Sequence, residues 1–435
     1  MILTLPSLEY QQKFLISSPI RDQVSFDQPK ICYVQSADKL SDRADQLIET
    51  ISPHSPLRLT IICDEITHGV LAAKTQRILS ARHLCRSIIL PTPLSADITF
   101  SQQIVAEAKE SELLIAVGSG TINDLVKYAA TQLKIPYVVF ATAPSMNGYC
   151  SASVSLIDQG IKKSIPANPP RAAFFDLAIL SRAPQKMIAA GLADCLCRST
   201  VQTDWLFSHF LVGTPYHQEI LNPLIDLEKR VIASVQLLRD GNQNAHNDLV
   251  QLIVHSGIGM AVVGNSNPAS QAEHMIAHYI DTQGDSVETS KFLHGEIIAV
   301  TTLTMAALQE KILSFKQLKL SVGFKYDHTW FNQVFGQEKA PEYWKGFQEK
   351  QFSLENQSNY QQKLTANWAE WRIKIQQNRL SYQLLSHMFK TMGLPTQPEH
   401  LNIRPDLYQK AVKYARFTRN RLTFLDLAAW LELLP

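Results

Sequence analysis

Ile115–Ser151 reads IAVGSGTINDLVKYAATQLKIPYVVFATAPSMNGYCS and decides the fold class. The apolar run Leu113–Val117 has the length and composition of a buried strand, and Gly118 ends it. Apolar side chains then recur at helical spacing from Ile122 to Leu133, and Tyr137–Phe140 is a second run of β-branched and aromatic residues. A strand, a helix and a strand of these lengths predict a βαβ unit on a parallel sheet.

The turn between the first strand and the helix is rich in glycine, with the sequence Gly118-Ser119-Gly120-Thr121. Such a turn exposes backbone N–H groups at the positive end of a helix dipole, where a phosphate or pyrophosphate binds readily. An ordinary βα turn also uses glycine, for its backbone dihedral angles. Taken alone, the four residues leave both explanations open.

Strands and helices alternate along the rest of the first half of the chain. The expected strands are Ile31–Gln35, Leu57–Cys63, Arg86–Leu90 and Ala173–Leu180, the expected helices are Asp38–Ile51, Ile66–Leu79 and Ser101–Glu110, and Val154–Ile157 with Lys162–Ile165 is an expected hairpin. This alternation is typical of an α/β domain with a Rossmann-like parallel sheet. We predict that this domain spans residues 1–183.

Beyond Pro184 nearly every segment has helical spacing. The expected helices are Ser199–His209, Gln218–Leu238, Ala245–Ala261, Ser270–Asp281, Leu293–Lys311 and Tyr408–Leu434. Residues 325–385 are rich in Gln, Lys, Trp and Tyr and are interpreted as a polar helical excursion with no assigned chemistry. The prediction is an all-helical second domain over residues 184–435.

The composition is that of an ordinary globular protein. Of 435 residues, 45% are hydrophobic and 18% are charged, and the net charge of +2 gives no electrostatic reason to expect nucleic acid or an anionic membrane. We find no apolar run of transmembrane length and no evident signal peptide. Six scattered cysteines suggest reduced thiols, with Cys195 and Cys197 interpreted as packing residues. We therefore expect a cytoplasmic protein without membrane insertion or a nucleic-acid partner.

Three places in the helical half carry possible metal ligands. Asp194 is expected to enter a helix, His274 and His278 lie four residues apart on one helical face, and His294-Gly295-Glu296 is expected to open a helix. One aspartate and two histidines make a divalent metal site with open positions, as a catalytic metal requires. Taken singly, a histidine on a helix is more often an ordinary surface or core residue than a metal ligand, and this alternative applies above all to His278.

An ordered set of motifs resembles the sn-glycerol-1-phosphate dehydrogenases, especially the longer bacterial type. The motifs are Gly118–Asp124, Thr142–Tyr149, Ala190-Gly191-x-x-Asp194, Asp204-Trp205, Pro268–His274 and His294-Gly295-Glu296, and the tail Arg419–Asp426 is also similar. That family lies within the superfamily of iron-containing alcohol dehydrogenases, glycerol dehydrogenases and 3-dehydroquinate synthases. The resemblance runs from about residue 57 to the C-terminus and implies a dehydroquinate synthase-like fold.

The resemblance also implies two cofactors, NAD(H) or NADP(H) and one divalent metal ion (zinc, nickel or iron). Asp194, His274 and His294 match the metal ligands. The implied cofactor-binding residues are Asp64, Gly118, Ser119, Gly120, Thr121, Asp124, Thr142, Ser145 and Ser151. Asp64 matches an acidic residue near the adenosine ribose, which favours NAD over NADP because a carboxylate repels a 2′-phosphate.

The implied reaction reduces dihydroxyacetone phosphate to sn-glycerol 1-phosphate, with the metal acting as a Lewis acid on the carbonyl. His278 is a candidate catalytic proton donor. Candidate substrate-binding residues are Asn147, Lys163 and Arg198, with Lys127 and Arg421 as further candidates for the phosphate. The bacterial relatives imply a homodimer.

Two other functions remain open from the sequence. One is another activity of the superfamily, that of a glycerol or alcohol dehydrogenase or of a dehydroquinate-synthase-like lyase. The other is a non-catalytic member that binds nucleotide or metal. Ala193 and Gln271 stand where the family usually has glycine, and these two positions favour the second alternative. Asn147 replaces a common aspartate, and together the three changes also suggest an altered substrate. The three intact ligand positions argue against a loss of activity.

Overall fold

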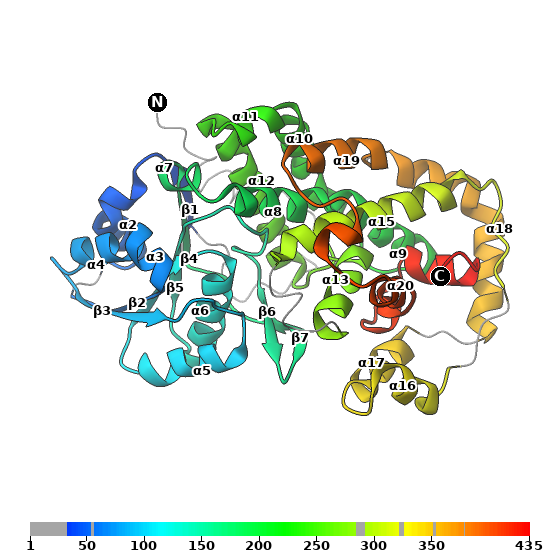
Figure 1. Cartoon of the computed structure of the whole chain (residues 1–435), viewed down its shortest axis with the longest axis horizontal. Coiled ribbons are helices and arrows are strands. Elements are labelled where there is room, and N and C mark those ends of the chain that lie inside the picture. Colours follow the sequence, from blue (N-terminus) through cyan, green and yellow to red (C-terminus); the bar gives the residue numbers. More distant parts are fainter. Residues whose placement is uncertain (1–32, 54–55, 284–291, 322–325, 351–353, 378) are drawn as a thin grey trace. The chain divides into compact units, whose positions relative to one another are not determined.

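The computed structural model describes residues 33–53, 56–283, 292–321, 326–350, 354–377 and 379–435 (Figure 1). The chain forms two compact units. The first comprises Met1–Cys195 and Gln218–Ser266, and the second comprises Leu196–His217 and Asn267–Pro435. All the described strands belong to the first unit, which we call the α/β unit, and the second is the helical unit. The boundary at residue 183 that the sequence suggests stays a prediction.

The α/β unit is built on six parallel strands in the order β1-β8-β5-β4-β2-β3. Their bounds are β1 Tyr33–Ala37, β2 Arg58–Asp64, β3 Leu84–Leu90, β4 Leu113–Gly118, β5 Tyr137–Ala141 and β8 Ala172–Asp176. From β2 the chain moves outward to β3 and then returns to the other side of β2 to form β4. The strand order therefore reverses between β2 and β4, and the predicted Rossmann-like sheet is confirmed.

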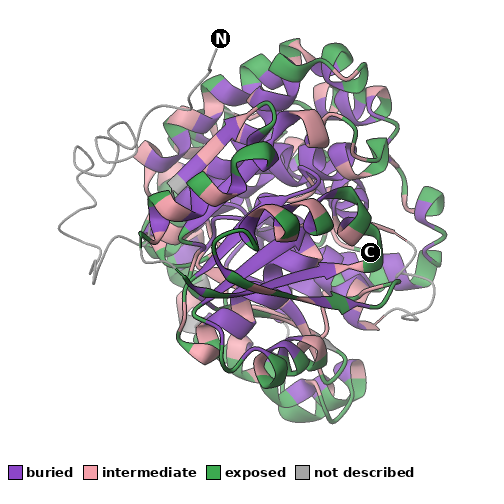
Figure 2. Ribbon diagram, turned by 90° about the vertical axis from the view of Figure 1, so that its left-hand side faces the viewer, coloured by how far each residue is buried: buried purple, intermediate pink, exposed green. Residues whose placement is uncertain are grey.

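Helices bury both faces of this sheet. Their bounds are η2 Leu40–Arg43, α2 Ala44–Ile51, α3 Glu65–Thr67, η3 His68–Ala72, α4 Ala73–Leu79, α5 Ile98–Glu107, α6 Gly120–Leu133 and α7 Leu177–Leu180. One face, with Ile61, Ile115 and Phe140, shares a core with η2, α2, η3 and α4. Residues of the other face, such as Ile62 and Ala116, are equally buried. The strands of the sheet are drawn mostly in the colour of buried residues in Figure 2. Burial on both faces is typical of parallel strands and explains their continuous apolar runs.

The predicted strand Ala173–Leu180 is wrong at its end, because Leu177–Leu180 forms helix α7. The side chain of Asp176 accepts a hydrogen bond from the backbone N–H of Ala178 and so caps this helix. The same carboxylate also accepts the backbone N–H of Ser41 at 2.9 Å, from a distant part of the sequence. The predicted hairpin is confirmed as β6 (Ser153–Asp158) paired antiparallel with β7 (Ile161–Pro166).

Further helices complete the α/β unit. Their bounds are α8 Gln185–Leu196, whose last residue belongs to the helical unit, α10 Gln218–Ala233, α11 Val235–Arg239 and α12 Gln243–Val263. Helix α12 contacts β1, α7 and α10 and carries His246, whose side chain is fully buried. Nδ1 of His246 lies 2.9 Å from the carbonyl oxygen of Asn242, and burial lowers the pKa of this histidine.

We expect His246 to make stability depend on pH in the acidic range. Its pKa in the folded protein lies below the ordinary value, so the unfolded chain takes up the proton first as the pH falls. The free energy of unfolding should therefore fall as the pH drops below 6.5, the ordinary histidine value. Thermal midpoints from about pH 7.5 to about pH 5 should show a shallower decline in His246→Leu than in the wild type. An exposed-site control, His387→Gln, should keep the wild-type slope, and an unchanged slope in His246→Leu would contradict the assignment.

The helical unit surrounds a large aromatic core. Its helices are α9 Arg198–Val212, α13 Ala272–Gln283, α15 His294–Ser314, α16 His328–Phe335, α17 Ala340–Glu349, α18 Leu354–Gln376, α19 Tyr382–Thr391, η4 Pro398–Leu401, α20 Pro405–Tyr414, η5 Ala415–Phe417 and α21 Phe424–Trp430. Buried Asp204 on α9 accepts the backbone N–H groups of Ala272 and Phe424 at 3.2 and 2.9 Å, and the side chain of Gln309 at 3.1 Å. One carboxylate thereby joins α9 to α13, α15 and α21.

Two segments of the helical unit relate to the sequence predictions. The polar excursion over residues 325–385 forms α16, α17, α18 and the start of α19, and Trp368 of α18 is buried and donates to the carbonyl oxygen of Phe315. Among the described helices, α15 alone is long and apolar enough to cross a membrane by composition. Of its most apolar window, 67% is buried inside the protein, which is expected for a core helix.

Candidate functional site

The predicted cofactor residues of the α/β unit gather at the carboxyl ends of three neighbouring strands. Asp64 is the last residue of β2 and Gly118 the last of β4, and Thr142 directly follows β5. The strands end together, since Ile62 pairs with Ala116 and Gly118 pairs with Ala141. In open α/β sheets ligands bind at this edge where the strand order reverses, which here is between β2 and β4.

Close packing is the reason for glycine in the turn after β4. Neither Gly118 nor Gly120 has a positive φ, so the dihedral explanation does not apply. A Cβ atom on Gly118 would lie 2.6 Å from the side chain of Ile122, and one on Gly120 would lie 2.6 Å from the sulfur of Met146. The backbone N–H of Gly120 donates to Oγ of Ser145 at 3.3 Å, at the N-terminus of α6. The turn after β4 and the loop after β5 are thus packed closely against each other and joined by a hydrogen bond.

Asp64 has a structural role at the end of β2. Its Oδ1 accepts the backbone N–H of Thr67 at 2.6 Å and the hydroxyl of Thr67 at 2.8 Å, while the N–H of Asp64 donates to the same hydroxyl at 3.0 Å. This is a capping box at the start of α3. Within the described chain no hydrogen bond reaches Oδ2 of Asp64, and this oxygen remains available to a ligand.

Lys127 of α6 holds the loop that follows β5. Its buried Nζ donates to the carbonyl oxygens of Gly148, Ser151 and Ser153 at 2.8, 3.1 and 3.2 Å, and to Oγ of Ser151 at 3.1 Å. One turn earlier, Asp124 accepts the backbone N–H of Ser155 at 3.0 Å. Burial raises the pKa of Asp124, and the charge of Lys127 opposes that shift. The hydrogen bonds of Asp124 and Ser151 described above are made within the protein, and their role in cofactor binding stays a prediction.

Asp194 lies in the last turn of α8, so the prediction that it enters a helix is wrong. Its Oδ2 accepts the backbone N–H of Asn147 at 2.7 Å, and Nδ2 of Asn147 donates to the backbone carbonyl of Asp194 at 2.8 Å. Both residues are buried. Asn147 thereby fixes Asp194 and the loop after β5 to each other. The neighbouring Ala193 is helical and fully buried, so its methyl group fits without a positive φ.

Three histidines meet within the helical unit. His274 and His278 lie on α13, and His294 is the first residue of α15. Their ring centroids are 5.3 Å apart for His274 and His294, 5.8 Å for His278 and His294, and 6.1 Å for His274 and His278. Buried Glu273 accepts the Nδ1–H of His274 at 2.8 Å. This bond orients the ring and leaves Nε2 as the nitrogen that can bind a metal ion.

A second group of potential ligands shares His274. Cys197, Glu273 and His274 each offer an atom, and these atoms all lie within 4.8 Å of one another. Cys197 lies just before α9, and its thiol is 3.8 Å from the carbonyl oxygen of Ala269. The helical unit therefore presents His274 with two kinds of possible partners, imidazole and thiol.

Two partly buried arginines contact Ser270, and one of them also contacts His278; the candidates named from the sequence included only Arg421. Arg419 donates to Nδ1 of His278 at 2.9 Å and to Oγ of Ser270 at 3.0 Å, and Arg421 donates to the carbonyl oxygen of Ser270. Burial lowers the pKa of Arg419 to about 10 and that of Arg421 to about 9, so both are cationic at neutral pH. The candidates for the phosphate named from the sequence did not include Arg419, although it lies in the Arg-Asn-Arg sequence of the tail.

The other basic candidates have partners of their own. Lys163 of β7 pairs with Asp158 at 3.1 Å on the hairpin, with about a third of each side chain exposed. Arg198 begins α9, is 4% exposed and donates to Gln202. Their predicted roles in substrate binding stay predictions.

Comparisons with known proteins agree with this arrangement. The model of the iron-containing alcohol dehydrogenase family matches residues 40–184. The glycerol-1-phosphate dehydrogenase (NAD(P)+) of Bacillus licheniformis is 27% identical over 390 residues, which cover 87% of this chain and 84% of that protein. The enzyme of the same name from Pyrococcus horikoshii is 30% identical over 250 residues, which cover 57% of this chain and 70% of the relative.

Solved structures show the same fold at low sequence identity. NADH-dependent butanol dehydrogenase A from Thermotoga maritima aligns with a TM-score of 0.62 and 11% identity over 94% of this chain and 98% of its own. A probable glycerol dehydrogenase from Sinorhizobium meliloti aligns with a TM-score of 0.59 and 16% identity over 88% of each chain. The predicted fold class is confirmed by these neighbours. Together with the sequence relatives, they establish that the chain belongs to the glycerol-1-phosphate dehydrogenase family, in the superfamily of iron-containing alcohol dehydrogenases, and is an NAD(P)-dependent oxidoreductase.

Proposed function

We propose that the protein reduces dihydroxyacetone phosphate to sn-glycerol 1-phosphate with NADH or NADPH. The observation that carries this proposal is the histidine and arginine cluster of the helical unit, where Arg419 contacts His278, His278 lies beside His294, and Arg419 and Arg421 both donate to Ser270. A ketone bearing a phosphate needs a cationic partner for the phosphate and a polar group for the carbonyl oxygen. The cluster supplies both kinds of group from one unit of the protein.

We propose that the edge formed by β2, β4 and β5 binds the dinucleotide. The N–H groups at the start of α6 suit the pyrophosphate, because they lie at the positive end of that helix. Oδ2 of Asp64, on the neighbouring strand, suits the ribose hydroxyls. In this role the cofactor supplies the hydride, and the protein supplies its position and electrostatic surroundings.

We further propose that Asp194, His274 and His294 hold one divalent metal ion. The donor set fits such an ion, since a carboxylate and two imidazoles are preferred ligands of zinc, nickel and iron. The Glu273–His274 bond supports this assignment because metal-binding histidines commonly donate their other N–H to a carboxylate. When bound, the ion would polarise the substrate carbonyl and stabilise the negative charge that develops on its oxygen.

Within this proposal His278 supplies the proton. Arginine has no acceptor atom, so the hydrogen bond from Arg419 fixes Nδ1 of His278 as an acceptor. The proton of the neutral ring is then on Nε2, which can donate to the alkoxide once hydride reaches the carbonyl carbon. Arg419 would thus bind the phosphate with one part of its guanidinium and set the tautomer of His278 with another.

The non-catalytic alternative loses its support in the structure. Ala193 fits in helix α8, and Gln271 donates from its side chain to the carbonyl oxygen of Asn267 at 3.0 Å. Neither replacement of the family glycine disturbs the local backbone, because neither residue has a positive φ. We propose in addition a homodimer in the cytoplasm, which analytical ultracentrifugation and cell fractionation would test.

The deciding experiment compares phosphorylated and unphosphorylated substrates in the metal-loaded enzyme. We would follow NADH and NADPH oxidation with dihydroxyacetone phosphate or dihydroxyacetone, after chelation and after separate addition of zinc, nickel or ferrous ions. The proposal expects turnover that returns with metal and requires the phosphate. Equal turnover of dihydroxyacetone would instead indicate a glycerol dehydrogenase, and binding of metal and NAD without turnover of either substrate would overturn the proposed reaction.

Asp64→Asn is expected to shift cofactor use toward NADPH. Asparagine caps a helix about as well as aspartate, so the contacts with Thr67 should survive and stability should change little. The variant loses the negative charge that repels a 2′-phosphate, so the ratio of kcat/KM for NADPH to that for NADH should rise about tenfold. Asp64→Ala is the comparison, since it removes the cap as well and should cost about 1 kcal/mol of stability. An unchanged cofactor ratio in both variants would remove Asp64 from the cofactor site.

A further inference from the structure

Both donor groups of Asn147 are directed at Asp194. The backbone N–H of Asn147 donates to Oδ2 of Asp194 at 2.7 Å, and its Nδ2 donates to the backbone carbonyl oxygen of Asp194 at 2.8 Å. Asn147 is 7% exposed and Asp194 is 3% exposed. A carbonyl oxygen can only accept a hydrogen bond, so the second contact requires the amide nitrogen of asparagine, and an ionised aspartate at position 147 could not make it.

The carbonyl group that Asn147 reaches lies at the end of a helix. Helix α8 ends at Leu196, so the carbonyl of Asp194 is one of the last four, which have no N–H partner further along the same helix. The amide of Asn147 supplies a donor at this point. The C-terminus of a helix carries a partial negative charge, which favours a donor there and disfavours a carboxylate.

The loop after β5 and helix α8 contact each other at two corresponding positions. A Cβ atom on Gly191 would lie 1.7 Å from the carbonyl oxygen of Pro144, so the loop approaches α8 as closely as glycine allows. Asn147 and Asp194 each come three residues later, and residues three apart on a helix share a face. The loop therefore runs along the face of α8 that carries Asp194.

Two other helices hold the backbone at Asn147. A Cβ atom on Gly257 of α12 would lie 2.9 Å from the carbonyl oxygen of Asn147, and Nζ of Lys127 on α6 donates to the carbonyl oxygen of Gly148 at 2.8 Å. The N–H that reaches Oδ2 of Asp194 thus belongs to a segment with contacts to three helices. The protein itself therefore fixes one oxygen of the Asp194 carboxylate.

We propose that Asn147 is a positioning residue for Asp194 and does not touch the substrate. This inference rests on the function proposed above, in which Asp194 is a ligand of the metal ion. The backbone N–H of Asn147 orients the carboxylate, and its side-chain amide holds the end of α8 that carries this ligand. Groups that orient a metal ligand contribute about 10- to 100-fold to metal affinity. The substrate-binding role suggested by the sequence is replaced by a role in metal binding.

The zinc affinity of Asn147→Ala tests the proposal on the full chain, because this variant removes the amide and keeps the backbone N–H. Competition with a chromophoric chelator, without substrate or cofactor, should show zinc binding about tenfold weaker than in the wild type. At saturating zinc, the KM for dihydroxyacetone phosphate should stay within about twofold of the wild-type value. A merely structural role would lower the thermal midpoint and leave the zinc affinity unchanged.

Asn147→Asp is the second variant, and it places a carboxylate against the backbone carbonyl of Asp194. We expect the thermal midpoint of the zinc-free protein to fall by about 5 °C, since a buried acceptor loses its donor. Asn168→Asp is the matched control, because it makes the same change at an exposed position of the same unit, and it should keep the wild-type midpoint. An unchanged midpoint in Asn147→Asp would contradict the contact on which the proposal depends.

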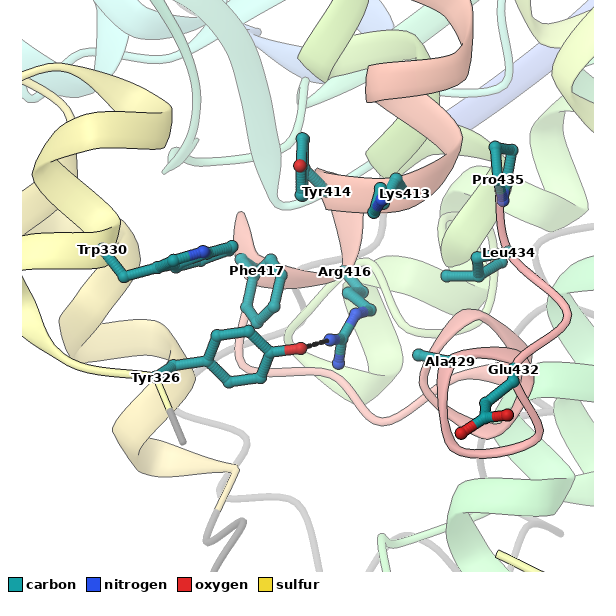
Figure 3. A pocket seen from close by; sticks show the side chains of 10 residues that line it. All are labelled: Tyr326, Trp330, Lys413, Tyr414, Arg416, Phe417, Ala429, Glu432, Leu434 and Pro435. Carbon is teal, nitrogen blue, oxygen red and sulfur yellow. Dashed lines mark hydrogen bonds between the residues drawn. The ribbon is translucent and has the colours of Figure 1, made fainter. Parts of the chain in front are cut away.

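A pocket of the helical unit supplies a control for adventitious zinc binding. It has a volume of about 360 Å³, and the described residues that line it include one acidic side chain, Glu432, with the basic side chains of Lys413 and Arg416 (Figure 3). None of the proposed metal ligands lines this pocket. Glu432→Gln should therefore bind zinc as the wild type does.

Asp194→Asn separates a failure of this proposal from a failure of the proposed metal site. If Asp194 is a ligand, this variant loses zinc. Zinc retained in Asp194→Asn would overturn the metal site and the role of Asn147 with it. Loss of zinc in Asp194→Asn, together with wild-type zinc affinity in Asn147→Ala, would overturn the role of Asn147 alone, as would a raised KM in Asn147→Ala at unchanged zinc affinity.

Discussion

Gly191→Ala is expected to destabilise the α/β unit by about 3 kcal/mol or more. A Cβ atom on Gly191 would lie 1.7 Å from the carbonyl oxygen of Pro144 and 2.8 Å from its carbonyl carbon. Both are backbone atoms, so either α8 or the loop after β5 must move. Alanine is otherwise favoured over glycine inside a helix by about 1 kcal/mol, so a loss of stability would diagnose the close approach itself. Urea or thermal unfolding of the two proteins measures the difference.

The same substitution should reduce activity beyond its effect on stability. The loop that would move carries Ser145 and Asn147, and α8 carries Asp194. Gly69→Ala is the matched control, because Gly69 is also helical, lies in the same unit and has no atom within 4 Å of the added Cβ. It should be neutral or slightly stabilising. If Gly191→Ala unfolds at the same midpoint as Gly69→Ala, the contact between α8 and Pro144 is not as described.

Local patterns were sufficient to predict the sheet, because each buried strand is an apolar run and the helices between the strands have apolar residues at helical spacing. The end of β8 was missed for a non-local reason. Asp176 stops the strand by capping α7, and it also accepts the backbone N–H groups of Lys39 and Ser41, more than 130 residues earlier in the chain. A run such as Ala173–Leu180 carries no local signal of these partners.

In the candidate site, too, the features with a local signal in the sequence were predicted, and the contacts between distant residues were not. Spacing within the sequence predicted that His274 and His278 share a face and that His294 opens a helix, and both expectations are confirmed. The contact of Arg419 with His278 joins residues 141 positions apart, and no pattern in the sequence indicates it. The turn at Gly118 was found by its glycines, but the physical reason for them, contact with Ile122, required coordinates.

Asp194→Asn is expected to abolish metal binding and to lower kcat by about a thousandfold or more. Loss of a charged ligand removes the ion, and with it several kcal/mol of stabilisation of the developing alkoxide. Asparagine keeps the size of the side chain and an oxygen for the N–H of Asn147, so the contact between α8 and the loop should persist. Metal content after dialysis, turnover with dihydroxyacetone phosphate and the thermal midpoint are the three measurements.

The variant Cys197→Ser tests which of two ligand sets binds the metal ion: the proposed set, Asp194, His274 and His294, or the second group, Cys197, Glu273 and His274. His274→Ala cannot do so, because His274 belongs to both groups, whereas Asp194 and Cys197 each belong to one. If Asp194, His274 and His294 bind the ion, Cys197→Ser should keep its metal and about the wild-type turnover, since serine is close to cysteine in size. Cobalt-substituted enzyme gives an independent readout, because a thiolate ligand produces an intense charge-transfer absorption band and oxygen and nitrogen ligands do not. A band that is present in the wild type and absent in Cys197→Ser, together with full metal content in Asp194→Asn, would transfer the site to Cys197, Glu273 and His274.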